Sequence, residues 1–364
     1  MNKLIIASAG SGKTTFIVSD AIDKARQGTN VLITTFTEAC EQEIKSKLVE
    51  KCGCVPKNIT VQTWFSFLIS HGVKPFQGSL FDFDVKGMLL VNGQSALYSK
   101  ESDIEKHYFT DSKKIYSDKL AKLVVKCHQA SHGMVFERIA RCFKYIYIDE
   151  VQDLAGYDLE VLDCLFKSNS NIVLVGDPRQ ATYSTNNSRK NKKYVKSEIV
   201  NFFEDNQLGI DTDNTSLTVN HRCFDSICHF SNKLYPDLQP ATSANNKITG
   251  HNGVYALPLE HVEEYLNIFK PIQLRDSIRT PINENFSVLN FGKSKGLTFN
   301  RVVIYPSGPM LKWLKNNDFD LTQTARSKLY VAITRARNSV AIVLKPNDIK
   351  KINGIEIYTP TSLP

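Results

Sequence analysis

Residues 7–14 read Ala-Ser-Ala-Gly-Ser-Gly-Lys-Thr, and their types and spacing point directly to phosphate chemistry. The segment follows the apolar run 4–6 and precedes a helix-compatible stretch, which gives the order strand, glycine-rich turn, helix. Gly10 and Gly12 let the backbone curl so that several N–H groups point at one anion. The N-terminus of the following helix adds partial positive charge. The sequence therefore predicts a nucleoside-triphosphate site.

Two side chains complete the predicted site. Lys13 can reach the outer phosphates as a point charge, and the Thr14 hydroxyl can bind Mg²⁺. The segment departs from the general pattern G-x-x-x-x-G-K-[ST] at its first glycine, which is Ala7 here. The predicted ATP-binding residues of this loop are Ala9, Gly10, Ser11, Gly12, Lys13, Thr14 and Thr15.

Two adjacent carboxylates, Asp149 and Glu150, follow the apolar run 145–148. Burying ionised groups is energetically costly, so such a pair at the end of a buried strand indicates a compensating cation, and a bound Mg²⁺ would be one. Asp149 would hold the metal together with Thr14, and Glu150 would orient and deprotonate the attacking water. The alternative is a solvated turn after a strand.

Three further side chains are candidates for phosphoryl-transfer chemistry. Gln180 follows the next apolar strand and is suited to sensing the γ-phosphate or the attacking water. Arg222 and Arg335 could supply positive charge from a second lobe, so that hydrolysis depends on closure of the cleft. Taken alone, an arginine of this kind is more often an ordinary surface charge.

Composition limits the class of protein. The 364 residues suffice for two compact domains, and 42% are hydrophobic. The formal net charge of +8 favours a polyanionic partner without proving one. The eight cysteines show neither disulfide-framework nor zinc spacing, which favours reduced thiols in a cytoplasm. No run is long enough to span a membrane, so the expected localisation is cytoplasmic.

Apolar, β-rich runs alternate with helical patterns, which predicts an α/β fold with parallel sheets covered on both faces. Three runs lie at 31–34, 145–148 and 172–175, and two more, at 302–305 and 340–344, suggest a second sheet. The predicted first lobe spans 1–69 and 141–205, a small, mostly helical insert spans 70–140, and the second lobe spans 206–364. The basic stretch 189–196 is either a contact for DNA phosphates or a solvated loop.

These motifs, taken in order, resemble superfamily 1 helicases of the UvrD/Rep/PcrA type. The matching segments are 7–14, 34–39 (motif Ia), 61–66 (Ib), 149–153 (II), 176–183 (III), 220–222 (IV), 292–299 (V) and 331–336 (VI). The resemblance implies two RecA-like P-loop lobes, with ATP at their interface and single-stranded DNA across their tops.

Applied residue by residue, the resemblance implies four nucleic-acid contacts and one more nucleotide contact. Thr35, Phe36, Thr63 and Lys295 fall where the family contacts the strand, and Gly296 falls in a nucleotide-binding motif. Phe36 would stack on a base, although a core aromatic is an equally good interpretation on physical grounds. The family also implies movement from 3′ to 5′ on single-stranded or 3′-tailed DNA.

Several positions depart from the family pattern. The adenine-stacking tyrosine of motif IV is His221, and the glutamate of motif V is Thr298. In motif III the base-stacking tryptophan aligns with Thr185 and the arginine with Asn186. With strand 4–6 beginning almost at Met1, we also expect the loop and arginines to grip phosphates more than the base.

Two functions follow from this combination. The first is an ATP-hydrolysing DNA helicase or translocase. The second is a nucleic-acid-gated ATPase or sensor subunit that regulates a partner such as a nuclease in a bacterial defence or repair complex. The missing tryptophan favours it, as do the small inserts at 70–140 and 229–289, which make this chain resemble a short version of the family with reduced accessory domains. A non-enzymatic DNA-binding module with a relic ATP site is a third class, and the retained Lys13, Glu150 and Arg335 argue against it.

Overall fold

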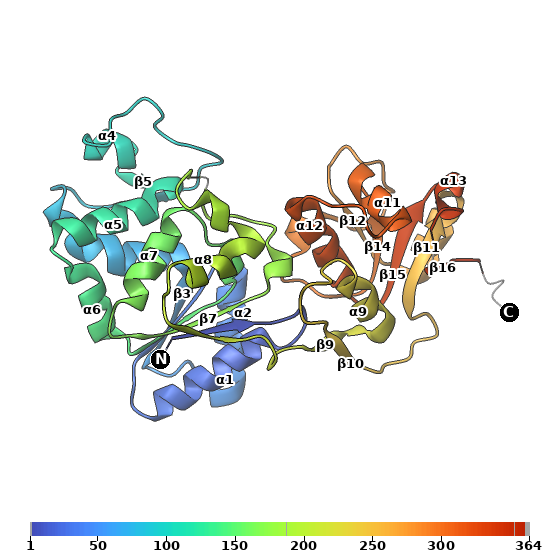
Figure 1. Cartoon of the computed structure of the whole chain (residues 1–364), viewed down its shortest axis with the longest axis horizontal. Helices are drawn as coiled ribbons and strands as arrows, with labels where there is room; N and C mark the ends of the chain where they lie inside the picture. Colours follow the sequence, from blue (N-terminus) through green and yellow to red (C-terminus); the bar gives the residue numbers. More distant parts are fainter. Residues whose placement is uncertain (1, 187, 353, 361–364) are drawn as a thin grey trace. The chain divides into compact units, whose positions relative to one another are not determined.

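The computed structural model describes residues 2–186, 188–352 and 354–360, which form two compact units (Figure 1). Unit 1 comprises Met1–Ile6, Lys13–Pro178 and Tyr183–Asp213. Unit 2 comprises Ala7–Gly12, Arg179–Thr182 and Asn214–Pro364. Most of the phosphate loop thus groups with unit 2, while the helix that follows it belongs to unit 1.

Unit 1 is built on a six-stranded parallel sheet with the order β3-β2-β6-β7-β1-β8. The strands are β1 (Asn2–Ile6), β2 (Val31–Thr35), β3 (Ile59–Thr63), β6 (Tyr145–Ile148), β7 (Asn171–Gly176) and β8 (Ile210–Asp213). The expected strands at 31–34, 145–148 and 172–175 are therefore confirmed. Because β8 pairs with β1, residues 210–213 belong to unit 1, although the sequence places them in the second lobe.

Helices cover both faces of this sheet (Figure 1). On one face lies α1 (Lys13–Arg26), whose Asp20 accepts a 2.6 Å hydrogen bond from the Tyr147 hydroxyl of β6. On the other face, Ile146 and Ile148 pack into a core with α5 (Leu120–Ala130) and α7 (Tyr157–Phe166). The remaining helices of unit 1 include α2 (Glu38–Cys52) and α8 (Ile199–Asp205). Strands that are apolar on both sides are what such a layered sheet requires.

Between β3 and β6 the chain forms a compact, mixed segment. It contains α3 (Trp64–Phe67), a π-helical turn η1 (Leu68–Val73), η2 (Lys74–Ser79), α4 (Ile104–Tyr108), η3 (Ser117–Lys119), α5 and α6 (Met134–Cys142). A two-stranded parallel sheet, β4 (Gly87–Leu89) with β5 (Lys114–Tyr116), lies among these helices. Gly72 is tightly placed, because a Cβ there would lie 2.6 Å from the Val124 side chain of α5.

Unit 2 contains a second six-stranded parallel sheet, with the order β13-β12-β14-β15-β11-β16. The strands are β11 (Gly253–Pro258), β12 (Ile272–Arg275), β13 (Val288–Asn290), β14 (Phe299–Tyr305), β15 (Ala336–Leu344) and β16 (Glu356–Ile357). A short parallel pair joins β9 (Val219–Phe224) to β10 (Thr242–Asn245). Two parallel sheets confirm the predicted fold class of two RecA-like α/β lobes.

The two faces of this second sheet pack against different helices. Ile304 and Ile342 share a core with α9 (Asp225–Asn232), α11 (Gly308–Lys315) and α12 (Gln323–Ile333). Val303 and Val343 point the other way and pack against α10 (Val262–Phe269). Helix α13 (Pro346–Ile349) follows the carboxyl end of β15. None of the helices formed by the described residues is both long and apolar enough to cross a membrane.

One buried carboxylate ties three elements of unit 1 together. Asp158 of α7 accepts a 2.7 Å hydrogen bond from the Trp64 indole of α3, and its second oxygen accepts one from the Thr185 hydroxyl. Thr185 also accepts from the Ala155 N–H at 3.0 Å. Burial raises the pKa of Asp158 to about 6, although the hydrogen bonds from Thr185 and Trp64 oppose that shift.

This raised pKa predicts a specific pH dependence of stability. The folded state binds the Asp158 proton more tightly than the unfolded state, whose ordinary value is 3.8. The contribution of Asp158 to stability is therefore fully present below about pH 4 and is lost as the pH rises through about 6. Relative to Asp158→Asn, the wild-type free energy of unfolding should fall by about 3 kcal/mol over that range.

Denaturant titrations at pH 4 to 7 measure this difference. Asp111→Asn is the matched control, because Asp111 is an exposed carboxylate of the same unit. A wild-type curve parallel to that of Asp158→Asn at every pH would show that the Asp158 proton does not contribute.

Candidate nucleotide and nucleic-acid sites

The glycine-rich loop is held against β9 within unit 2. The His221 N–H donates to the Gly10 carbonyl at 3.0 Å, and the Ser8 N–H donates to the Leu217 carbonyl at 3.0 Å. Gly10 has φ +70°, and a Cβ there would lie 2.5 Å from Asn220 Oδ1. Both the backbone conformation and the available space therefore require glycine at this position.

The other end of the loop leads into α1. Lys13, Thr14 and Thr15 are its first three residues, where helical N–H groups have no intrahelical acceptor. Gly12 has φ +85°, and a Cβ there would meet nothing within 4 Å. The loop thus combines a left-handed turn, open space and a helix N-terminus, which fits a polyphosphate.

The donor set for a metal ion is small. Thr14 offers a hydroxyl and Asp149 a buried carboxylate, both hard oxygen ligands of the kind that Mg²⁺ takes. Within the described ranges, no group of three His, Cys, Asp or Glu residues could hold a metal ion. The residues present therefore fit a Mg²⁺ that arrives with phosphates and keeps water ligands, rather than an all-protein cage.

The acidic pair has an unusual backbone. The Asp149 carboxylate accepts from the Glu150 N–H at 2.9 Å, and Glu150 lies in the left-handed region with φ +56° and ψ +40°. That conformation costs a non-glycine residue about 1–2 kcal/mol. Strain of this kind is typical of functional sites, where it aims a side chain that relaxed backbone would turn away.

Gln152 positions this pair, a role that the sequence alone did not indicate. Its side-chain amide donates to the Glu150 carboxylate, and its Oε1 accepts from the Asp177 N–H at 3.1 Å. Gln152 is 1% exposed. It links the end of β6 to the end of β7, so the Glu150 carboxylate is oriented by a neighbouring strand.

Hydrogen bonds within unit 2 bring Gln180 and Arg335 together. Arg335 Nη2 donates to Gln180 Oε1 at 3.0 Å, while Nε and Nη1 donate to the Val331 and Leu297 carbonyls at 3.1 Å. Both side chains are buried. These three hydrogen bonds to neutral oxygens fix the orientation of the Arg335 guanidinium.

Arg222 lies beside this group. Its Nη1 donates to the Thr334 carbonyl at 3.2 Å, and its N–H donates to Asn220 Oδ1 at 2.8 Å. Asn220 also accepts from the Cys223 N–H at 2.9 Å, so it fixes the turn that carries Arg222 past Gly10. Asn220 is a second positioning residue missed at the level of sequence, although it begins motif IV.

Motif V contributes its backbone to the same region. Gly296 has φ +83° and is exposed, and the next residue, Leu297, supplies the carbonyl that holds Arg335. Lys295 is half-buried in this loop. Its N–H donates to the Gly292 carbonyl at 3.0 Å in η9 (Gly292–Ser294).

The predicted nucleic-acid residues of unit 1 follow the ends of β2 and β3. Phe36 is half-buried, and its ring centroid lies 6.0 Å from that of Phe65 and 6.3 Å from that of Tyr183. Thr35 is buried, and Thr63 caps α3 by accepting from the Ser66 N–H at 3.2 Å. These three aromatic rings form an aromatic cluster. Of the three, the sequence predicts only Phe36 as a contact residue, and the structure places Phe65 and Tyr183 beside it.

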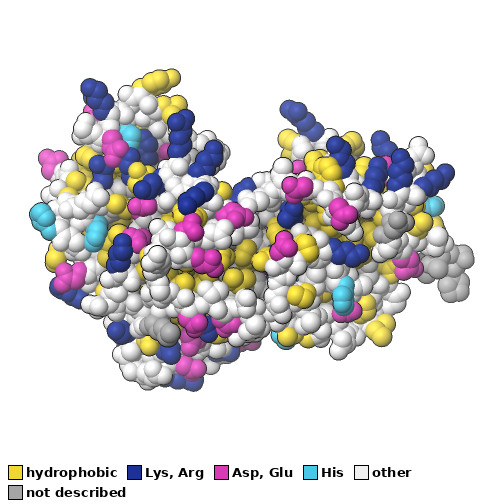
Figure 2. Space-filling view, in the orientation of Figure 1, with side chains coloured by type: hydrophobic (Ala, Val, Ile, Leu, Met, Phe, Trp, Pro, Cys, Tyr) yellow, Lys and Arg dark blue, Asp and Glu magenta, His cyan; other side chains and the backbone are white. Residues whose placement is uncertain are grey.

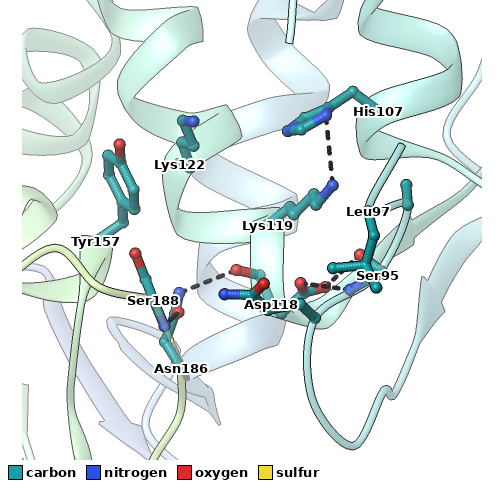
Figure 3. A pocket seen from close by; sticks show the side chains of 11 residues that line it. Ser95, Leu97, His107, Asp118, Lys119, Lys122, Tyr157, Asn186 and Ser188 are labelled. Atoms are coloured by element: carbon teal, nitrogen blue, oxygen red, sulfur yellow. Dashed lines mark hydrogen bonds between the residues drawn. The ribbon is translucent and has the colours of Figure 1, made fainter. Parts of the chain in front are cut away.

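The end of motif III packs against the insert instead of lying open. Thr185 and Asn186 are both buried, and the Asn186 amide donates to the Asp118 carbonyl at 3.0 Å. Asn186 lines a cavity of about 210 Å³ together with Ser95, His107, Lys119 and Tyr157, among others (Figure 3). Thr185 therefore cannot stack on a base as the family's tryptophan does.

The basic stretch 189–196 is partly neutralised. Lys190 pairs with Glu160 at 3.4 Å, and Lys193 pairs with Asp205 at 3.0 Å. These ion pairs anchor the stretch to α7 and α8 within unit 1.

Together, two parallel α/β sheets, a glycine-rich phosphate loop after β1 and an acidic pair after β6 of the same sheet define a P-loop protein. The sequence model of the UvrD/REP helicase N-terminal domain matches residues 1–71 and 86–196, which is half of the chain. The chain therefore belongs to the UvrD/REP helicase family.

Individual relatives are more distant. Gabija protein GajB of Bacillus cereus (strain VD045) is 26% identical over 260 residues, which cover 68% of this chain and 49% of GajB. One subunit of the ATP-dependent helicase/nuclease of Ligilactobacillus salivarius (strain UCC118) is 46% identical over 50 residues, or 13% of this chain and 4% of that protein. The chain thus spans about half the length of GajB and a small part of the second relative.

Among solved structures, an Arterivirus nonstructural protein 10 (helicase), in complex with DNA, matches with a TM-score of 0.49 and 15% identity. That match covers 94% of this chain and 61% of the viral chain.

The geometry at Gly10 yields a prediction. Gly10→Ala adds a Cβ in a left-handed conformation and against Asn220, so it should distort the loop and weaken ATP binding at least tenfold. Fluorescent-nucleotide titration measures the loss. Gly78→Ala is the control, because a Cβ there meets nothing within 4 Å. Unchanged affinity in Gly10→Ala would mean that the loop does not hold the nucleotide.

Proposed function

We propose that this protein is an ATP-dependent single-stranded DNA translocase or helicase. Three contacts within unit 2 carry the proposal: Arg335 donates to Gln180, Arg222 donates to the carbonyl of Thr334 beside Arg335, and the Gly10 carbonyl accepts from the N–H of His221 beside Arg222. A phosphate loop, a γ-phosphate sensor and two arginines are what ATP hydrolysis needs in one place. Membership of the UvrD/REP family supports the DNA substrate, and the 3′-to-5′ direction follows from the family resemblance.

In the proposed reaction, each residue has a defined task. Lys13 and the N–H groups at the start of α1 bind the β- and γ-phosphates. Glu150, oriented by Gln152, accepts the proton of the attacking water, and Gln180 orients that water. Arg222 and Arg335 stabilise the charge on the transferred phosphoryl group. Thr14 and Asp149 would hold Mg²⁺, which neutralises phosphate charge when bound.

The aromatic cluster of Phe36, Phe65 and Tyr183 would hold the DNA strand. Aromatic rings stack on bases of any sequence, as a translocase requires. Thr35, Thr63 and Lys295 would contact the backbone. Because Thr63 already accepts the Ser66 N–H, it would contribute through its position more than through a free hydroxyl.

A second function has one specific observation in its favour. Thr185 and Asn186, at the family's stacking tryptophan and arginine positions, are buried against Asp158 and the insert. A strand grip with fewer aromatic contacts suits a nucleic-acid-gated ATPase that regulates a partner such as a nuclease. The name of the second relative, which belongs to a helicase/nuclease, is consistent with such a pairing.

Glu150→Gln tests the hydrolysis mechanism. It should lower the rate of ATP hydrolysis about 10²- to 10⁴-fold, the usual contribution of a general base, while nucleotide affinity is retained. Steady-state turnover, with and without single-stranded DNA, measures the effect. Glu50→Gln, an exposed carboxylate of α2, should behave as wild type. Wild-type turnover in Glu150→Gln would remove Glu150 as the base.

Phe36→Ala tests the proposed strand contact. Loss of one stacking ring should weaken single-stranded DNA binding by about 1–3 kcal/mol, roughly 5- to 150-fold, in fluorescence anisotropy. Phe36→Tyr retains the ring and should restore most of the affinity. Equal affinities for all three proteins would assign Phe36 to the core alone.

Strand displacement separates the two functions. The translocase should unwind a 3′-tailed duplex by itself, whereas the gated ATPase should hydrolyse ATP on DNA without displacing the strand.

A further inference from the structure

Unit 2 presents four basic side chains along one edge of its parallel sheet. Strands β12, β14, β15 and β11 are consecutive neighbours, so their amino ends lie at the same edge. Lys270 precedes β12, Arg301 lies near the start of β14, and Arg337 is the second residue of β15. Lys247 lies in the segment before β11. Four separate strand ends therefore each supply one cation.

These cations line one pocket of about 650 Å³. The full lining is Lys247, Thr249, Phe269, Lys270, Ile272, Thr298, Phe299, Asn300, Arg301, Arg337 and Asn338, which includes no carboxylate. In the part of the chain that the structure describes, none of the four cations has a carboxylate oxygen within 4.0 Å. Elsewhere in unit 2, lysines do find such partners, as Lys315 does with Asp348 at 2.6 Å.

Arg301 is the fixed element of this pocket. Its Nη1 donates to the Ser339 hydroxyl at 2.9 Å and to the His251 carbonyl, and its Nη2 donates to the Thr249 hydroxyl at 3.1 Å. Its guanidinium carbon lies 5.1 Å from the ring centroid of Phe269. Burial lowers the pKa of Arg301, which reflects a desolvated charge held by neutral groups. A desolvated cation is costly unless an anion balances it.

The pocket is distinct from the candidate nucleotide site. Val303 and Tyr305 share with Arg301 the face that packs against α10. Arg335 follows α12, which covers the opposite face. The backbone of the pocket adjoins the nucleotide residues at two points: the Phe299 N–H donates to the Arg335 carbonyl at 2.9 Å, and Thr298 is the neighbour of Leu297. Arg335 itself points to Gln180 and does not line the pocket.

We propose that this pocket is a second phosphate-binding site, which takes phosphate groups of a nucleic-acid strand. Arg and Lys side chains with no acidic neighbour, supported by the amides of Asn300 and Asn338, match phosphate oxygens in charge and hydrogen bonding. Its volume exceeds that of one phosphate and suits a run of them. The phosphate chemistry follows from the pocket alone, whereas the nucleic-acid source rests on the proposed function.

Basic side chains are not confined to this pocket. On the face shown in Figure 2, Lys and Arg side chains lie among Asp and Glu side chains in both units. The net charge of +8 is thus spread over the chain, and an acid-free group of four is a local feature. Local convergence, more than net charge, gives a phosphate site its affinity.

The test removes the three exposed charges and leaves Arg301 in place. The variant is Lys247→Gln/Lys270→Gln/Arg337→Gln. The matched control, Lys345→Gln/Lys350→Gln/Lys351→Gln, removes the same charge from exposed residues of unit 2 at and beyond the opposite end of β15. Affinity for a fluorescein-labelled single-stranded DNA is measured against salt concentration. ATP turnover without DNA should match wild type in both variants.

We expect the pocket variant to lose at least fivefold in DNA affinity at about 0.1 M salt, and its log–log salt slope to fall by about 2, since each lost contact removes about 0.7. The control should change affinity by less than about twofold, because salt ions screen the exposed charges that it removes. A second arm titrates tripolyphosphate into the Lys13→Ala protein with and without the pocket substitutions.

The outcomes are distinguishable. Loss of DNA affinity in the pocket variant supports a strand phosphate site, and loss of tripolyphosphate binding alone supports the same chemistry with a free polyphosphate as ligand. Pocket and control variants that match wild type in both arms would overturn the proposal. A separate measurement tests the proposed function itself: if DNA does not stimulate ATP turnover in the wild-type protein, the proposed function is wrong.

Discussion

Parallel pairing of buried strands is the constraint on which both candidate sites depend. In a parallel sheet all carboxyl ends meet at one edge, so residues far apart in sequence become neighbours without any direct contact specifying it. Five residues lie at the carboxyl ends of strands of the unit 1 sheet. Ala7, Asp149 and Asp177 directly follow β1, β6 and β7, whereas Thr35 and Thr63 are the last residues of β2 and β3. Phosphate, metal and strand contacts can therefore be assembled from single residues at successive strand ends.

In unit 2, the candidate residues lie at the amino ends of the strands instead. Arg335 and Arg337 flank the first residue of β15, and Thr298 directly precedes β14. The amino ends of these strands carry guanidinium groups that are hydrogen-bonded to nearby oxygens, as Arg335 is to the Val331 carbonyl and Arg301 is to two hydroxyls. A guanidinium held this way keeps its orientation, which is the preorganisation that anion binding and phosphoryl transfer both need.

Features that depend on residues close together in the sequence could be predicted, whereas contacts between residues far apart in the sequence could not. Apolar runs such as 145–148 and 172–175 predict their strands correctly, because burial on both faces leaves a continuous hydrophobic signature. The Gly10 turn can also be predicted from sequence, since a left-handed backbone favours glycine. The hydrogen-bond partners of individual side chains cannot be predicted in this way. Gln152 meets the Asp177 N–H, and Asn220 meets Gly10, only after the sheets have formed.

Thr185 shows how a departure from a family pattern acquires a structural meaning. Its hydroxyl serves Asp158 and the Ala155 N–H at once, so the residue at the stacking-tryptophan position became a bridge between α7 and motif III. Restoring a tryptophan there would remove a partner of a fully buried carboxylate and overfill the site, at a cost well above that of a surface change. The presence of Thr185 at this position therefore accounts both for the absence of a stacking ring and for the buried hydrogen bonds to Asp158. In the proposed function, strand binding would then rely on the aromatic cluster of Phe36, Phe65 and Tyr183 and on basic side chains such as those at the amino ends of β12, β14 and β15.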